Sequence, residues 1–245
     1  MNFLILDGET CNTPMIKGQL DIKSGQVYDL GGAIINEYGK EFTHFSIVNE
    51  DVFFRMPEQM KEAYYADKIP QYLEDMRLGK RKIMHTIDLY FVVRQLIKEY
   101  SVQAIVAHNA KFDIATLNAT VRYQTKSRNR WFLPYGIKVI DSLVLAKKVY
   151  GTNPQYIAYC KEHGYMTNHA TPRPRLTAEV LWRYISNNEN FIESHTGLED
   201  VEIEKEIFIK CLEALRTKAP KFRAGTFYTF VTIFLLTFAT LGSII

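Results

Sequence analysis

Short apolar runs along the first part of the chain predict the strands of one sheet. Residues 3–6 form an apolar run bounded by turn residues, and 26–33 and 41–48 are two β-rich runs joined through a turn that contains glycine. Two more β-rich segments follow at 102–106 and 137–140, and Asp141, directly after the second, is expected to cap the next helix. We therefore expect five strands, the first three of them antiparallel.

Helical periodicity occupies much of the remaining sequence. Apolar residues recur at helical spacing after Thr86 and again after Asn109, and we expect these two polar residues to cap the two helices. Asn153 and Pro154, followed by Gly164, predict a further helix by the usual signals for a helix start and end. Helices thus alternate with strands in the later part of the chain.

Composition limits the class of protein without deciding it. The chain has 245 residues, close to half of them apolar, which suits one large domain better than two small ones. A formal net charge of +3 permits a phosphate-bearing partner but does not require one. Cys11, Cys160 and Cys211 are far apart and lack metal-ligand spacing. We expect reduced thiols of a cytoplasmic protein, with no signal peptide before the first strand.

Two carboxylates close the first apolar run. Asp7 and Glu9 are two residues apart, and side chains at such spacing on a strand point to the same face. Because two buried carboxylates repel each other unless a cation neutralises them, the pair suggests a divalent-metal site. A solvated turn after the strand is the alternative interpretation.

Acidic residues also stand at two later junctions. Asp113 falls in the first turn of the helix after the fourth predicted strand, where an acid can simply complement the helix dipole. His195 and Asp200 would lie about 140° apart on a helix. They can face one site only if His195 lies on the loop that enters the helix, and the Thr-Gly pair 196–197 allows such a loop. Taken singly, a surface histidine and a first-turn acid are the alternatives.

Two stretches are rich in basic residues. Segment 122–131 carries four of them beside Trp131, a composition that suits a nucleic-acid backbone with base stacking and suits a solvated loop equally well. Residues 80–82 form a Lys-Arg-Lys cluster, which we expect to be a solvated loop rather than a phosphate contact.

The candidate residues form an ordered set with a recognisable spacing. Asp7-x-Glu9, then His108-Asn109-x-x-Phe112-Asp113, then His195 followed five residues later by Asp200, resemble the three exonuclease motifs of the DEDDh family. The family includes the epsilon proofreading subunit of bacterial DNA polymerase III, and a phage-type stand-alone exonuclease would also fit. Gly8 and Gly197 stand where the family usually has a bulkier residue and an alanine.

The resemblance implies a fold and a reaction. The fold would be a ribonuclease H-like three-layer α/β structure, with a mixed five-stranded sheet and helices on both faces. The reaction would be 3′–5′ exonuclease hydrolysis of DNA at single-stranded 3′ ends, as in proofreading or repair, with two Mg²⁺ or Mn²⁺ ions. DNA is preferred here over RNA as the substrate, a choice that depends on a pocket the sequence does not reveal.

The resemblance also implies a role for each motif residue. Asp7 would bridge the two metal ions, Glu9 and Asp200 would complete one metal site, and Asp113 would hold the second ion. His195 would be the general base that takes a proton from the attacking water. Two further residues next to the acids are expected to contact the terminal nucleotide: Thr10 and Asn109.

Two hypotheses from different classes remain. The first is the exonuclease, with a nucleic acid that has a free 3′ end as substrate and a polymerase or other replication protein as a conceivable partner. The second is a non-catalytic protein of the same fold that binds nucleic acid or acts as a membrane-tethered scaffold. Four acids that repel phosphate without metal favour the first hypothesis.

The far end of the chain departs from this pattern. We predict an exonuclease domain over 1–217, a basic linker over 218–225 and an apolar tail over 226–245. The tail has 20 residues without a charge, which at about 1.5 Å per residue could cross a hydrocarbon core of ~30 Å. A membrane anchor with the catalytic domain in the cytoplasm, a segment that docks on another protein, and an out-of-place appended sequence are the alternatives.

Overall fold

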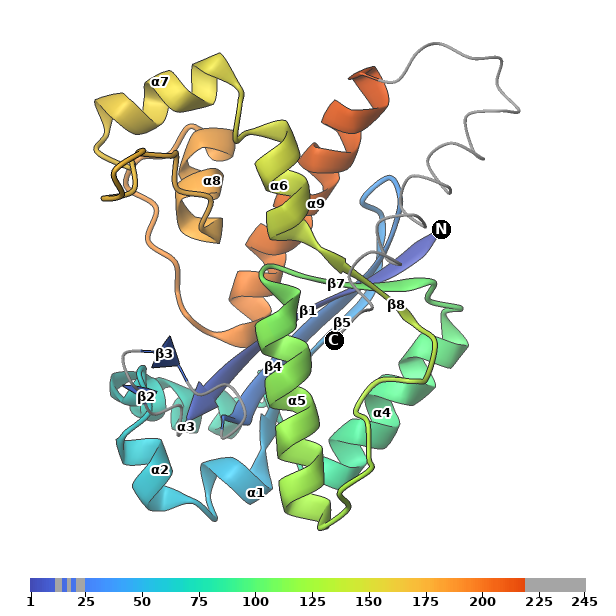
Figure 1. The fold of residues 1–245 in the computed structure, drawn as a ribbon. Coiled ribbons are helices and arrows are strands. Elements are labelled where there is room, and N and C mark those ends of the chain that lie inside the picture. The colour runs from blue at the N-terminus through green and yellow to red at the C-terminus, as the bar shows by residue number, and fades with distance from the viewer. Residues whose placement is uncertain (12–14, 17–18, 21–24, 219–245) are drawn as a thin grey trace.

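A mixed sheet forms the middle of the molecule (Figure 1). The computed structural model describes residues 1–11, 15–16, 19–20 and 25–218. Within this part the main sheet has six strands in the order β6-β5-β4-β1-β7-β8, and a small hairpin pairs β2 with β3. The strands are β1 (Asn2–Cys11), β2 (Met15–Ile16), β3 (Gln19–Leu20), β4 (Gln26–Asn36), β5 (Glu41–Asn49), β6 (Lys82–Met84), β7 (Ala104–Ala107) and β8 (Lys138–Asp141).

The strand pairing confirms the antiparallel start of the sheet. β4 pairs antiparallel with both β1 and β5, whereas β1 pairs in parallel with β7, and β7 with β8. The sixth strand, β6, joins the edge in parallel with β5. Its three residues begin at Lys82, inside the basic cluster, and are too few and too exposed to show a strand pattern in the sequence.

Helices cover both faces of the sheet. The helical elements are α1 (Glu50–Phe53), α2 (Pro57–Lys61), the 3-10 turn η1 (Ala66–Lys68), α3 (Ile69–Arg77), α4 (Thr86–Glu99), α5 (Ala110–Thr125), α6 (Ser142–Val149), α7 (Pro154–Glu162), α8 (Ala178–Ser186) and α9 (Gly197–Lys218). In Figure 1, α4 and α5 lie against one face, and α6 and α9 lie against the other.

Side chains of β1 point alternately to the two faces of the sheet, and this alternation explains why helices pack on both faces. Phe3 and Ile5 pack into the apolar cluster that includes α6, α8 and α9. Leu4 and Leu6 point to the opposite face and pack with α4 and α5. Because successive strand residues point to opposite faces, a run of four apolar residues in β1 is buried on both sides. The predicted three-layer α/β architecture is confirmed.

Local capping signals worked at some helix starts and not at others. Asp141 and Asn153 accept hydrogen bonds from backbone N–H groups in the first turns of α6 and α7, as expected. The expected cap at Asn109 is wrong in one respect, because its side chain makes no capping hydrogen bond and its backbone is left-handed, with φ of 71°. The expected cap at Thr86 is wrong, because Thr86 is the first residue of α4 and its N–H donates to Asp51 Oδ2 at 2.8 Å, with His85 as the N-cap.

The predicted linker and tail, 218–225 and 226–245, lie outside the described residues except for Lys218, the last residue of α9. The domain boundaries and the anchor therefore stay predictions. Among the helices of the described part, none has both the length and the apolar character needed to cross a bilayer. The three cysteines are buried and have free thiols.

Candidate active site

Asp7 and Glu9 occupy the far end of β1, on the face that meets α9. They continue the odd-numbered positions of Phe3 and Ile5, which pack against that helix. A register irregularity between Glu9 and Thr10 then breaks the regular pairing of β1 with β4. The predicted substrate contact at Thr10 therefore follows immediately after this irregularity.

His195 lies on the loop before α9. The helix begins at Gly197, and His195 has a left-handed backbone with φ of 54°. Donor atoms of Glu9, His195 and Asp200 all lie within 4.8 Å of one another, so these three side chains could share a metal ion. The backbone turn at His195 therefore brings an imidazole and a first-turn carboxylate to one point, which a continuous helix would not do.

Asp113 is buried in the first turn of α5, with an exposed fraction of 5%. Burial raises the pKa of Asp113 well above its usual range, and the nearby carboxylate of Asp7 raises it further. A first-turn acid that merely complements a helix dipole would be solvated. The burial of Asp113 beside Asp7 instead joins α5 to the acidic group at the end of β1.

Burial and mutual repulsion raise the pKa values of the carboxylates at the end of β1 and the start of α9. Burial raises the pKa of Asp7 to about 7, and the carboxylates of Glu193 and Asp29 add to the shift. The pKa of Glu9 rises to about 10 through burial and then through Asp7 and Asp200. Burial and Asp7 likewise raise the pKa of Asp200 to about 9. Such a group holds protons at neutral pH unless a cation replaces them.

Two further carboxylates belong to the same neighbourhood and escaped the sequence analysis. Glu204 lies one helical turn after Asp200 on α9, and burial followed by Asp7 raises its pKa well above the ordinary value. Its Oε2 accepts a hydrogen bond of 3.2 Å from the backbone N–H of His108. The spacing of four residues from Asp200 was a usable signal for Glu204.

Glu193 precedes His195 by two residues, and no sequence signal marked it. Its carboxylate groups with His195 and with Glu179 of α8, all with donor atoms within 4.8 Å of one another. Burial and then Glu179 raise the pKa of Glu193 to about 7. His195 therefore has donor atoms of four carboxylates close to it: Glu9, Asp200, Glu193 and Glu179.

His108 and Asn109, the motif residues before Asp113, lie at the junction between β7 and α5. His108 is largely enclosed, and its ring nitrogens contact Ser142 Oγ at 3.0 Å and the carbonyl of Leu176 at 2.7 Å. Asn109 is exposed, and its backbone N–H donates to Asp141 Oδ1 at 3.1 Å. His108 thus ties the junction to neighbouring elements, whereas the amide of Asn109 faces solvent.

A buried arginine holds the start of α9 against the sheet. Arg81, 4% exposed, donates two hydrogen bonds of 3.0 Å to the carboxylate of Glu199, and also binds Asp29 and Asp75 at 3.2 Å each. The expectation of a solvated basic loop at 80–82 is therefore wrong for Arg81. Three carboxylates from β4, α3 and α9 compensate the cost of burying its charge, and residue spacing does not reveal them.

Asp29 connects this ion network to the backbone of α9. Its Oδ2 accepts hydrogen bonds from the Tyr72 hydroxyl at 2.7 Å and from the Gly197 N–H at 2.9 Å. Helix and strand approach closely here, since a Cβ added to Gly197 would lie 2.6 Å from the nitrogen of Gly31. Glycine at 197, where the resembling family usually has alanine, is thus required by contact with β4.

Comparison with known proteins gives the fold. The sequence matches no family model and no curated protein. Among solved structures, two of a 3′-exonuclease, one of them recognising the 3′ end of a histone mRNA stem-loop, share 11% and 13% identity with this chain. Each alignment covers 86% of this chain and 81% of the other, with a TM-score of 0.53.

A third solved structure is exonuclease I from Methylocaldum szegediense, at 14% identity and a TM-score of 0.50. The alignment covers 95% of this chain but only 43% of that larger protein. At such low identity these likenesses concern the fold alone. The chain has the ribonuclease H-like three-layer fold, with a mixed sheet of six strands among the described residues.

Proposed function

We propose that this chain is a metal-dependent 3′–5′ exonuclease of the DEDDh type that acts on single-stranded 3′ ends of DNA. The observation that carries the proposal is the group of Glu9, His195 and Asp200, whose donor atoms lie within 4.8 Å of one another. They come from β1, the loop before α9, and α9 itself. Because β1 is far in the sequence from the loop and α9, it is the folding of the chain that brings the three side chains together.

The donor set fits hard divalent cations. Carboxylate oxygens are the ligands that Mg²⁺ and Mn²⁺ prefer, and burial of several carboxylates together is favourable only when positive charge accompanies them. We assign the metal ligands to Asp7, Glu9, Asp113 and Asp200. Two ions held there would neutralise charge on the phosphodiester and lower the pKa of an attacking water.

His195 is the residue that we assign to proton transfer. Burial lowers its pKa, so the ring is neutral near pH 7 and able to accept a proton from the attacking water. Its Nδ1 is 4.0 Å from Glu193 Oε2, which leaves Nε2 as the nitrogen for this task. The left-handed backbone of His195 directs the ring toward the acids instead of along α9.

The proposal also includes the residues that contact the substrate, the kind of nucleic acid and the class of partner protein. Thr10 and the exposed Asn109 are assigned to contacts with the terminal nucleotide, because Thr10 directly follows Glu9 and Asn109 lies one helical turn before Asp113. The resemblance of the motifs to proofreading subunits supports DNA as substrate and a polymerase as the class of partner.

Digestion of end-labelled oligonucleotides tests the proposal. Single-stranded DNA and RNA, labelled at either end, are incubated with Mg²⁺, Mn²⁺ or EDTA and with the wild type, Asp200→Ala or His195→Ala. We expect a metal-dependent ladder from the 3′ end of DNA, with loss of activity in Asp200→Ala and a loss of about 10²- to 10⁴-fold in His195→Ala. His169→Ala, which alters an exposed histidine, is the matched control.

Three outcomes would contradict it. Full activity in Asp200→Ala would refute the metal assignment, and equal or faster cleavage of RNA would refute the choice of DNA. No cleavage with any metal, together with metal-independent binding of the oligonucleotides, would favour the non-catalytic binding protein.

A further inference from the structure

The last turns of α5 and the loop after it form a surface that combines positive charge with exposed aromatic rings. Between residues 114 and 140 the sequence has five basic residues and no acidic one, so this segment alone is more positive than the whole chain, whose net charge is +3. We call the following residues the basic–aromatic surface: Arg122, Tyr123, Lys126, Arg128, Arg130 and Trp131.

The side chains of this surface are arranged as charged groups over open rings. The Arg122 guanidinium lies 4.7 Å from the centroid of the Trp131 ring, and the Lys126 ammonium lies 4.3 Å from that of Tyr123. Both residues keep more than half of their surface exposed, 62% for Trp131 and 53% for Tyr123. Arg122, Tyr123, Lys126 and Arg128 line a shallow cavity of about 510 Å³.

The charge of the surface is not compensated by nearby acids. Within the described ranges of the chain, no carboxylate lies within ion-pair distance of Arg122, Lys126, Arg128 or Arg130. Some exposed cations elsewhere on the protein do have such a partner, as Lys61 has in Glu58. A group of four unpaired cations indicates an anionic partner.

Hydrogen bonds hold the surface in one arrangement. The Arg122 Nε donates to the carbonyl of Arg130 at 2.9 Å, and the backbone N–H of Phe132 donates to Asn118 Oδ1 at 2.8 Å. Ser127 N–H donates to the Arg122 carbonyl at 3.2 Å. Because the loop is tied to α5 at three points, less conformational entropy is lost when a ligand binds.

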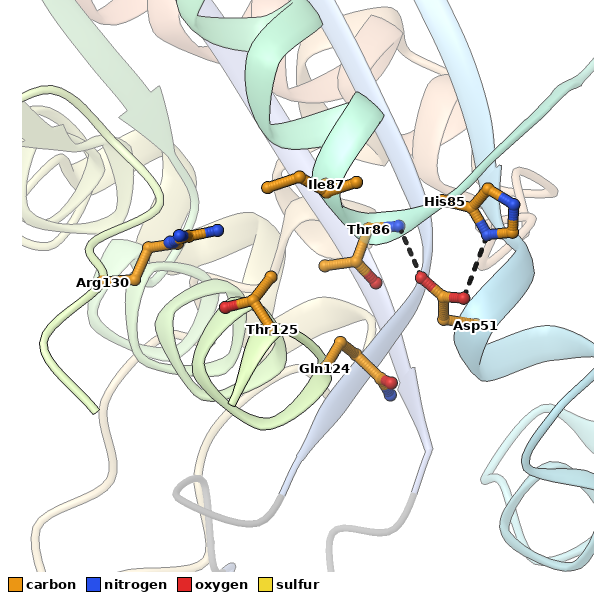
Figure 2. Close-up of a pocket in the computed structure, with 7 residues that line it drawn as sticks. All are labelled: Asp51, His85, Thr86, Ile87, Gln124, Thr125 and Arg130. Carbon is orange, nitrogen blue, oxygen red and sulfur yellow. Dashed lines mark hydrogen bonds and ion pairs between the residues drawn. The ribbon is translucent and has the colours of Figure 1, made fainter. Parts of the chain in front are cut away.

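Arg130 borders a second cavity of about 370 Å³ between the end of α5 and the start of α4 (Figure 2). Figure 2 shows Asp51 on the opposite side, where it accepts hydrogen bonds from the Thr86 N–H and from His85. That carboxylate is engaged in capping α4. The cation of Arg130 forms no ion pair with Asp51 and lies over the Tyr90 ring, 5.7 Å from its centroid.

We propose that the basic–aromatic surface binds single-stranded nucleic acid upstream of the 3′ end that enters the candidate active site. Cations pair with phosphates in any sequence, and exposed indole and phenol rings offer faces on which bases stack. An acidic protein would use the cations but would leave the exposed surfaces of Trp131 and Tyr123 uncovered. The proposal rests on the proposed function for the position of the 3′ end.

Distances along α5 support this geometry. Arg122 and Lys126 lie nine and thirteen residues after Asp113 on the same helix. At 1.5 Å per residue they are about 13 to 20 Å from it along the helix axis. A stacked strand advances about 3.4 Å per nucleotide, so about four to six nucleotides would span the interval.

Binding without metal tests the surface separately from catalysis. Fluorescence anisotropy in EDTA measures the affinity of the full chain for labelled strands of about 20 and about 3 nucleotides. Lys126→Gln/Arg128→Gln removes two exposed cations of the surface. Lys161→Gln/Arg173→Gln removes two exposed cations from α7 and the segment after it and is the matched control. Circular dichroism checks that both variants are folded.

We expect weaker binding of the long strand by the surface variant and unchanged binding by the control variant. The Kd for the long strand rises about 10-fold or more in the surface variant, and the slope of log K against log salt falls by about 1.4, for two phosphate contacts. The affinity ratio of the long to the short strand shrinks by a similar factor. Trp131→Ala raises the Kd about 5-fold or more through lost stacking. The control variant retains the affinity of the wild type.

Other outcomes separate this proposal from the proposed function. Equal affinity in the surface and control variants would overturn the binding surface, whether or not the chain cleaves nucleic acid. Competition by poly-glutamate as strong as that by an oligonucleotide of equal charge would also overturn it and would indicate an acidic protein partner. Because the assay contains no metal, a chain without exonuclease activity would still give the expected binding difference.

Discussion

The imidazole of His195 lies flat against the phenol ring of Tyr65, with ring centroids 4.2 Å apart and planes 11° from parallel. Tyr65 precedes η1, and its sequence position, far from every motif, carries no hint of this contact. The stack fixes the plane of the imidazole beside Glu9 and Asp200 and covers one face of it. Tyr65 thus acts on the candidate general base through packing.

The stack makes a prediction about the titration of His195. Burial lowers the pKa of the imidazole, and the Tyr65 ring supplies part of that burial. Tyr65→Ala should therefore raise the pKa of His195 toward its ordinary value, whereas Tyr65→Phe, which keeps the ring, should not. NMR titration of the imidazole in the metal-free protein measures this. An unchanged pKa in Tyr65→Ala would show that other groups bury the ring.

The acidic group predicts how the stability of the metal-free protein depends on pH. The pKa values are about 7 for Asp7, about 9 for Asp200 and about 10 for Glu9 in the folded chain, against about 4 in an unfolded one. A raised folded pKa stabilises the folded state fully below pH 4 or so, and this contribution is lost as the pH rises through the folded pKa. Stability in EDTA should therefore fall between about pH 4 and pH 10.

Thermal melting at about pH 5.5 and about pH 8 checks this prediction. In Asp200→Asn one of the shifted carboxyls is absent, so the Tm should fall less with rising pH than in the wild type. Mg²⁺ or Mn²⁺ should raise the Tm of the wild type more at the higher pH, because the ion competes with protons for the same oxygens. Identical pH dependence in both proteins would contradict the coupling of these acids.

The buried position of Glu204 beside the candidate ligands predicts that its substitution weakens metal binding. Glu204 is buried one turn after Asp200 and accepts the N–H of His108. Glu204→Gln keeps an acceptor for that N–H but removes a carboxylate next to the ligands, so Mn²⁺ should bind about 10- to 100-fold more weakly. Isothermal titration calorimetry measures the affinity, and Glu206→Gln on the same helix is the control. Equal weakening in both variants would indicate a general charge effect.

The buried ion pairs of Arg81 predict that its substitution causes a large loss of stability. Arg81→Met leaves the buried carboxylate of Asp29 without its cation, which should lower the free energy of unfolding by about 3–5 kcal/mol. Lys80→Gln removes the neighbouring charge, an exposed lysine paired with Asp75, and should cost less than about 1 kcal/mol. Urea denaturation compares the two. A small effect of Arg81→Met would mean that Asp29 is protonated or solvated in the folded protein.

The contact between α9 and β4 predicts unequal effects of two alanine substitutions. Gly197→Ala sets a Cβ 2.6 Å from the nitrogen of Gly31 and should cost about 1–3 kcal/mol as the start of α9 moves away. Gly8→Ala meets nothing nearer than 3.4 Å and should change stability by less than about 1 kcal/mol. Chemical denaturation measures both. Similar values would show that the helix start shifts without strain.

Periodicity and local chemistry determined much of the fold in advance. The strand at 3–6, the helix after Asn153 and the cap at Asp141 follow from side-chain alternation and capping, which act over a few residues. β6 escaped because its three residues are mostly exposed and owe their strand conformation to pairing with β5. The cap expected from the side chain of Asn109 failed because the backbone there turns left-handed at the β7–α5 junction.

The sequence by itself determined which acids are candidates for the site, since the ordered spacing of Asp7, Glu9, Asp113, His195 and Asp200 is a property of the chain alone. Only the tertiary structure decided that Glu193 and Glu204 share their surroundings, that Tyr65 covers His195, and that Arg81 is buried. The physical reason is the separation along the chain over which each kind of interaction acts. Capping and alternation act between neighbours, whereas burial, ion pairing and pKa shifts depend on residues that folding brings together from distant segments.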